Sequence, residues 1–144
     1  MTFSYKRHIF GYECDIYGHL NNANYLRILE EARSMVMTEI NFPVKKLLRL
    51  NLAIFVIDIH IKYLKQIDFA ENITVKSCVK KFGRVKSNWY QEVYNENGQL
   101  CATAEIQGAF ASGGKATRLE KELYNQMNTN LKNKKIVNKR KEQA

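Results

Sequence analysis

One short stretch of the sequence carries most of the side chains that could do chemistry. It runs from Cys14 to Tyr25 and reads CDIYGHLNNANY, so that Asp15, His19 and three asparagines crowd around one glycine. A long segment with apolar residues at helical spacing follows, which is typical of a polar loop that leads into a helix. The first N–H groups of a helix have no partner within it and can polarise a carbonyl or hold an anion. We therefore expect the Asp15 carboxylate and a set of N–H donors to converge on one small volume.

Helix capping is the alternative interpretation of the same residues. Asp, Asn and Gly before a helix are ordinary capping and turn residues. Capping needs only one of them, however, and here five polar residues fall within ten positions: Asp15, His19, Asn21, Asn22 and Asn24. The density of the stretch favours chemistry.

The stretch resembles the signature of hotdog-fold acyl-CoA thioesterases of the 4-hydroxybenzoyl-CoA thioesterase type. That pattern is Asp-x-x-Gly-His-x-Asn-Asn-x-x-Tyr-Leu, followed by Glu-x-Ala-Arg. The matching residues here are Asp15, Gly18, His19, Asn21, Asn22, Tyr25, Leu26, Glu30, Ala32 and Arg33. The stretch is also similar to the Asp-x-Asn-x-His-x-Asn-Asn run of acyl-ACP thioesterases, with Tyr17 in place of the first Asn. The resemblance covers about residues 3 to 112 and implies hydrolysis of an acyl-CoA, or of an acyl-ACP, without a cofactor.

The resemblance assigns the reacting carboxylate to Asp15, as nucleophile or as general base, and the oxyanion donors to N–H groups at the helix start. Gly18 and His19 would support the site, and the His19 imidazole could orient water, bond the thioester oxygen or only stabilise the loop. Asn22 stands where some relatives carry a histidine, and it could position Asp15 or cap the helix. Tyr25 is a supporting candidate that we expect to face the core instead.

Other charged residues are lesser candidates. Some hotdog enzymes carry a catalytic glutamate on the central helix, which makes Glu30 and Glu31 candidates here. Glu30 is one turn from Arg33, so an ion pair is the alternative. Four cations on or beside strands could meet the phosphates of CoA, although lysines are also common on the exposed face of a sheet: Lys62, Lys65, Arg84 and Lys86.

Hydrophobic periodicity indicates the elements that must position these residues. A helix is expected over about residues 22–40, ended by Phe42-Pro43, with a possible short helix over 44–50. Strands are expected over residues 3–12, 53–64, 73–80, 85–93 and 100–110. In the second of these, alternate residues should form one buried face: Phe55, Ile57, Ile59, Ile61 and Tyr63. This order predicts an α+β hotdog fold, with an antiparallel five-stranded sheet wrapped around one long central helix.

The composition suits one domain followed by a basic tail. The chain has 144 residues, 45% of them hydrophobic, and a net charge of +9. We expect a hotdog thioesterase domain over residues 1–114 and a basic tail over 115–144, with a short helix over 118–127 and then disorder. The tail holds nine Lys or Arg and three Glu. Its run of lysines has no aromatic residue to stack on bases, so nucleic acid is not an expected partner.

The sequence gives little sign of other site classes. Three cysteines without a close pair and three histidines without ligand spacing indicate neither a disulfide framework nor a metal site. No apolar run reaches the length of a membrane span, and we expect a cytoplasmic protein. The resemblance implies a homodimer or homotetramer. A non-catalytic acyl-binding or regulatory module on the same fold is the alternative function.

Overall fold

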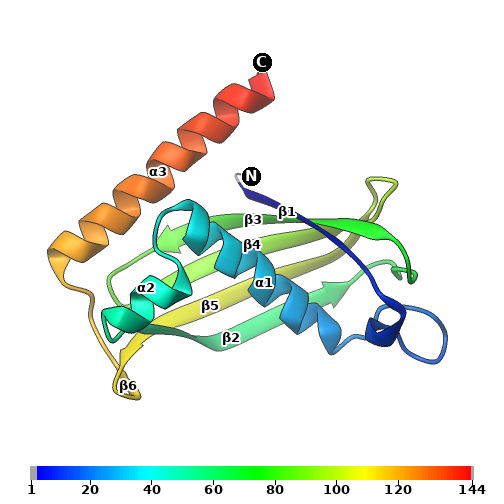
Figure 1. Cartoon of the computed structure of the whole chain (residues 1–144), viewed down its shortest axis with the longest axis horizontal. Helices are drawn as coiled ribbons and strands as arrows, with labels where there is room; N and C mark the ends of the chain where they lie inside the picture. Colours follow the sequence, from blue (N-terminus) through cyan, green and yellow to red (C-terminus); the bar gives the residue numbers. More distant parts are fainter. Residues whose placement is uncertain (1–2, 144) are drawn as a thin grey trace.

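An antiparallel sheet curls around α1 (Asn24–Glu39), and α2 (Val44–Arg49) lies on the same side of the sheet (Figure 1). The structure is a computed structural model that describes residues 3–143, with side chains for residues 3–133. Its strands are β1 (Phe3–His8), β2 (Ala53–Tyr63), β3 (Asn72–Phe82), β4 (Lys86–Tyr94), β5 (Leu100–Ser112) and β6 (Lys115–Ala116). A short 3-10 turn, η1 (Gly11–Glu13), follows β1, and α3 (Lys121–Gln143) comes last.

The strand order is β1-β3-β4-β5-β2, with the short β6 paired to β5. All pairs are antiparallel. The predicted α+β hotdog architecture is confirmed, with β6 as an addition to the five expected strands. Gly113 and Gly114 both have positive φ, so they turn the chain back into β6 instead of ending the sheet.

The core lies between α1 and the inner face of the sheet. One stripe of α1 is buried at helical spacing: Tyr25, Ile28, Leu29, Ala32, Val36 and Met37. It faces alternate residues of β3, β4 and β5, as the period-two patterns predict. One polar side chain, Gln91 of β4, is fully buried here. Its Nε2 donates to the Leu29 carbonyl oxygen at 3.1 Å and to Ser77 Oγ at 2.9 Å, so the amide links the helix to the sheet.

Strand β2 departs from the prediction of one continuous buried face. Its pairing with β5 shifts between Val56 and Asp58, which indicates a β-bulge. The extra residue changes which side chains point inward, because the side-chain period of a strand is two. Ile59 and Ile61 pack against the core as expected, but Phe55 is 52% exposed. Because β2 is also the last strand of the sheet, its apolar residues remain partly open to water.

Helix α3 is longer than predicted, and the expected disorder after residue 127 is wrong. The helix begins at Lys121 and continues to Gln143, a stretch without glycine or proline to interrupt it. Its first half packs on the core through Met127 and Leu131, and Asn130 Nδ2 donates to the Ile40 carbonyl oxygen at 2.8 Å. The later half extends away from the sheet (Figure 1). The domain boundary at residue 114 stays a prediction, and no helix in the described range is apolar and long enough to cross a bilayer.

An ion-pair network ties the start of the chain to α1. Arg7 of β1 pairs with Glu13 at 2.7 Å and with Glu31 of α1 at 3.0 Å. Tyr5 donates its hydroxyl to Glu31 at 2.9 Å, and the Phe10 N–H donates to Glu13 at 3.0 Å. Burial by itself would raise the pKa of the Glu13 carboxyl, but the bonds from Arg7 and Phe10 outweigh it and lower that pKa. Glu13 therefore remains a charged, buried anchor just before the Asp15 loop.

The packing of α3 on the core is tested by Met127→Ala. Met127 has no exposed surface, so its truncation should lower the free energy of unfolding by about 2–5 kcal/mol. Thr129→Ala, at an exposed position of the same helix, is the control and should change it by less than about 0.5 kcal/mol. Urea denaturation of both variants measures the difference. Equal stabilities would show that α3 does not contribute to the core.

The Arg7 network is tested by Arg7→Met at two pH values. Its removal leaves Glu13 buried without a cation and should cost about 3 kcal/mol at pH 7. A carboxyl with a lowered folded pKa contributes stability above its ordinary pKa, and this contribution is lost as the pH falls through the lowered value. The cost of Arg7→Met should therefore shrink at about pH 3, where Glu13 becomes protonated. Urea denaturation with the exposed Lys6→Met as control measures it, and equal costs at both pH values would contradict the network.

Candidate functional site

The Asp15 side chain is held by a tight loop between Cys14 and Leu20, which form a β-bridge. The Asp15 N–H donates to the His19 carbonyl oxygen at 2.8 Å. In return, Asp15 Oδ1 accepts the N–H of Tyr17 at 2.9 Å and that of His19 at 3.2 Å. Both bonds use the same carboxylate oxygen. Among the described residues no cation pairs with Asp15, so its carboxylate is oriented by the main chain and not neutralised.

Gly18 and His19 support this loop from the main chain. Gly18 has a φ of 78°, a left-handed conformation that glycine adopts without strain, and its carbonyl oxygen accepts the Phe69 N–H at 3.1 Å. The His19 ring does not contact Asp15. Its Nε2 lies 3.4 Å from Asp68 Oδ1. Of the roles expected for His19, the structure thus places its ring beside the neighbouring loop and its N–H on the Asp15 carboxylate.

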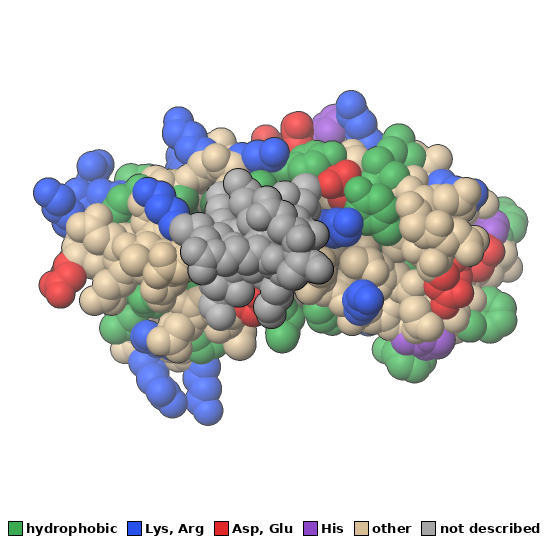
Figure 2. All heavy atoms as spheres, turned by 90° about the horizontal axis from the view of Figure 1, so that it is seen from above, with side chains coloured by type: hydrophobic (Ala, Val, Ile, Leu, Met, Phe, Trp, Pro, Cys, Tyr) green, Lys and Arg blue, Asp and Glu red, His purple; other side chains and the backbone are tan. Residues whose placement is uncertain are grey.

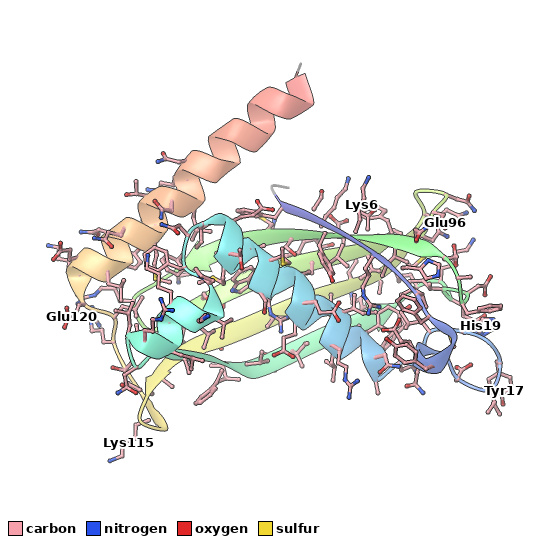
Figure 3. All side chains as sticks on the ribbon, in the orientation of Figure 1. Lys6, Tyr17, His19, Glu96, Lys115 and Glu120 are labelled. Carbon is pink, nitrogen blue, oxygen red and sulfur yellow. The ribbon has the colours of Figure 1, made fainter. Side chains whose placement is uncertain are left out.

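The loop joins α1 through Glu13. The Glu13 carbonyl oxygen accepts the Asn21 N–H at 3.1 Å and Asn24 Nδ2 at 2.7 Å, so the residue that opens α1 is fixed two positions from Asp15. The asparagine that shapes this turn is Asn21, whose Oδ1 accepts the Ala23 N–H at 2.9 Å. Asn22 neither caps the helix nor bonds Asp15, and its side chain is exposed. Figure 3 shows Tyr17 and His19 at the end of the molecule opposite Lys115 and Glu120.

Tyr25 faces the core, as expected. It is 3% exposed and packs edge to face on Tyr63, with ring centroids 5.1 Å apart. Burial raises the pKa of the Tyr25 hydroxyl, with smaller contributions from Cys101 and Tyr63, so it stays protonated at neutral pH. The Tyr63 hydroxyl donates to the Asn22 carbonyl oxygen at 3.1 Å, which joins the end of β2 to the start of α1.

A groove with a volume of about 550 Å³ runs along α1, between α1, α2 and strands β2, β4 and β5. On α1 it is lined by one stripe that begins in the first turn: Leu26, Glu30, Arg33, Ser34 and Met37. Its floor includes Trp89 and Ile106 of the sheet. Asp15 does not line the groove, but Leu26 at its upper end is only two residues from the first residue of α1. The sequence did not predict this groove, since it combines residues from five elements.

The structure separates the two candidate glutamates of α1. Glu31 is held by Arg7 and Tyr5 on the side of β1, which leaves it no role at the groove. Glu30 is exposed and lines the groove. The expected ion pair with Arg33 is absent from the described residues, where no carboxylate lies within 4.0 Å of this guanidinium. Arg33 Nη1 instead donates to Gln91 Oε1 at 2.9 Å.

The four candidate cations for CoA phosphates are not brought together within one chain. Lys62 and Lys65 lie at the end of β2, where Tyr63 contacts the start of α1. Arg84 and Lys86 lie at the turn between β3 and β4, at the other end of the sheet, where Arg84 Nε donates to the Leu119 carbonyl oxygen at 2.8 Å. On the face shown in Figure 2, Lys and Arg side chains lie at several places and form no single patch.

Comparisons with known proteins agree with this fold and with the signature stretch. The thioesterase-like superfamily matches residues 11–127. The chain is 32% identical over 97 residues to the long-chain acyl-CoA thioesterase FadM of Escherichia coli, covering 67% of this chain and 73% of that one.

Solved structures share the fold. A DHNA-CoA thioesterase from Staphylococcus aureus superimposes with a TM-score of 0.84 at 22% identity, covering 91% of each chain. A hypothetical protein from Aquifex aeolicus gives a TM-score of 0.81 at 24% identity, covering 87% of this chain and 98% of its own. The predicted thioesterase family is therefore confirmed, and the chain belongs to the thioesterase-like superfamily of hotdog enzymes.

Proposed function

We propose that the protein hydrolyses acyl-CoA thioesters and that the Asp15 carboxylate is the reacting group. The observation that supports this is the way Asp15 is held. Two main-chain N–H groups bind Oδ1, and among the described residues nothing bonds Oδ2 or neutralises the charge. A fixed carboxylate beside the first N–H groups of a helix combines the two things that thioester hydrolysis needs, a base or nucleophile and donors for the oxyanion.

Two routes lead to the same products. In the first, Asp15 attacks the thioester carbonyl carbon, the C–S bond breaks, CoA leaves, and water then hydrolyses the acyl–Asp15 anhydride. In the second, Asp15 takes a proton from water, and that water attacks the carbonyl carbon directly. In both, N–H groups at the start of α1 stabilise the negative charge that develops on the carbonyl oxygen. Gly18, His19 and Asn22 support the site through the loop, and Glu30 is the remaining alternative carboxylate.

The groove along α1 is our proposed site for the acyl group. Its lining is mostly apolar, and it starts next to the Asp15 loop. The E. coli relative is named a long-chain acyl-CoA thioesterase, which is consistent with an elongated apolar groove of about 550 Å³. Lys62 and Lys65 lie at the same end as Asp15 and are the better candidates to meet the CoA phosphates. An acyl-ACP substrate and a cytoplasmic location remain alternatives and expectations that this argument does not require.

We also propose that two copies associate through β2. This strand is a sheet edge whose outer backbone groups have no strand beyond them in the single chain. Three apolar residues in a row on it are about half exposed, at 52%, 47% and 49%: Phe55, Val56 and Ile57. Pairing β2 with its copy would satisfy the edge and cover these side chains.

Asp15→Asn tests the catalytic assignment. The amide keeps hydrogen-bond acceptance at Oδ1 but can neither attack nor take a proton, so the rate should fall by roughly 10²–10⁴. Thiol release from a panel of acyl-CoAs, with carrier-bound acyl groups beside them, measures the effect and the preferred substrate together. Asp58→Asn, an exposed carboxylate on β2, is the matched control and should keep the wild-type rate.

Equal rates for wild type and Asp15→Asn would reject the assignment. Absence of thiol release from every substrate, together with saturable acyl-CoA binding, would instead favour the non-catalytic acyl-binding module.

A further inference from the structure

Arg33 is a partly buried cation that lacks a counter-ion in the single chain. Its hydrogen bond to Gln91 Oε1 joins it to a neutral amide that is itself fully buried. That amide is already oriented, because its Nε2 donates to Leu29 and Ser77, so Oε1 is fixed as the acceptor for Arg33. Burial lowers the pKa of the Arg33 guanidinium, and the charge of Glu30 opposes this shift. A charge taken out of water normally has a charged partner, and here none of the described residues supplies one.

Glu30 is the complementary group on the same surface. It lies three residues before Arg33, lines the same groove, and makes no hydrogen bond or ion pair within the described chain. The other carboxylates near α1 do have partners, because Arg7 holds both Glu13 and Glu31. The groove wall of α1 therefore carries one unpaired anion and one unpaired cation, a single helical turn apart.

Two-fold symmetry would match these charges. In an interface between two copies related by a two-fold axis, if residue i contacts residue j then j also contacts i. Two antiparallel α1 helices that face each other through this stripe can place each glutamate on the arginine opposite. The apolar edge of β2 is continuous with the stripe, because Phe55 and Val56 line the groove as well. A second copy at this edge would therefore lie over the groove.

We propose that a second copy of this chain covers the groove, and that Arg33 of each copy pairs with Glu30 of the partner subunit. This inference deepens the proposed function and rests on its association through β2, but not on hydrolysis by Asp15. Two equivalent ion pairs form in each dimer, and each closes the open side of a groove. The groove is then a channel between subunits, and a single chain has only part of its wall.

Three charge reversals test the pairing by analytical ultracentrifugation. Glu30→Arg and Arg33→Glu each place like charges across the two-fold axis, so each alone should weaken dimerisation roughly 30-fold or more. An equimolar mixture of the two variants should restore the affinity, because each heterodimer then has both opposite-charge contacts. Glu39→Arg is the control, since Glu39 is an exposed glutamate of α1 that does not line the groove, and it should dimerise like the wild type.

Glu30→Gln covers the case in which Arg33→Glu does not fold. Glu30 is exposed, so this change should leave folding intact and still weaken the dimer at least roughly tenfold. An ion pair within one helix makes a different prediction: the double variant Glu30→Arg/Arg33→Glu would recover, while the mixture of single variants would not.

Several results would overturn the proposal. They are a monomeric wild type, a dimer indifferent to both residues, or recovery only in the double variant. A further one is an Arg33→Gln variant that changes only the KM for acyl groups carrying a second carboxylate, since the counter-ion would then belong to the substrate. Asp15→Asn separates this inference from the proposed function, because it should abolish thiol release and leave the dimer affinity unchanged.

Discussion

Glu13 is the residue on which the geometry of the site depends. Its carboxylate is buried and held by Arg7 of β1, while its carbonyl oxygen holds Asn21 and the first residue of α1. The same residue thus joins an edge strand, the polar loop and the central helix. Asp15 is two positions away, and its carboxylate can be aimed only because both ends of its loop are fixed. A loop stabilised by its own hydrogen bonds alone would leave the carboxylate free to move relative to the helix donors.

The second constraint is the open edge of the sheet. The bulge in β2 turns apolar side chains to both faces of the strand, and the absence of a further strand leaves them half exposed. The groove, the exposed edge and the unpaired charges of Glu30 and Arg33 all occur on this side of α1. On the opposite side, β1 and the Arg7 network satisfy the polar groups. This asymmetry is what an incomplete binding site would show, and it explains why a site on one chain has only part of its wall.

Residues close together in sequence could be interpreted correctly from the sequence alone. The helix ended near Phe42-Pro43, and β3, β4 and β5 have the inward residues that their alternation predicts. The bulge in β2 escaped the same reasoning, since one extra residue leaves the apolar character of the strand unchanged but reverses its faces. The continuation of α3 was missed because a polar, basic composition resembles a disordered tail, while the contacts of Met127 and Leu131 lie on distant elements.

The sequence by itself determined the family, the α+β order of elements and the polar stretch around Asp15, since these follow from residue types at short spacing. Only the tertiary structure decided which candidates belong to one site. Glu31 and Glu30 are neighbours in the sequence, yet one is held by β1 and the other faces the groove. Lys62 and Arg84 are equivalent as basic residues near strands, yet they lie at opposite ends of the sheet. The physical reason is that a helix directs adjacent residues to different faces and a sheet separates the two ends of its strands, so proximity depends on packing and not on residue type.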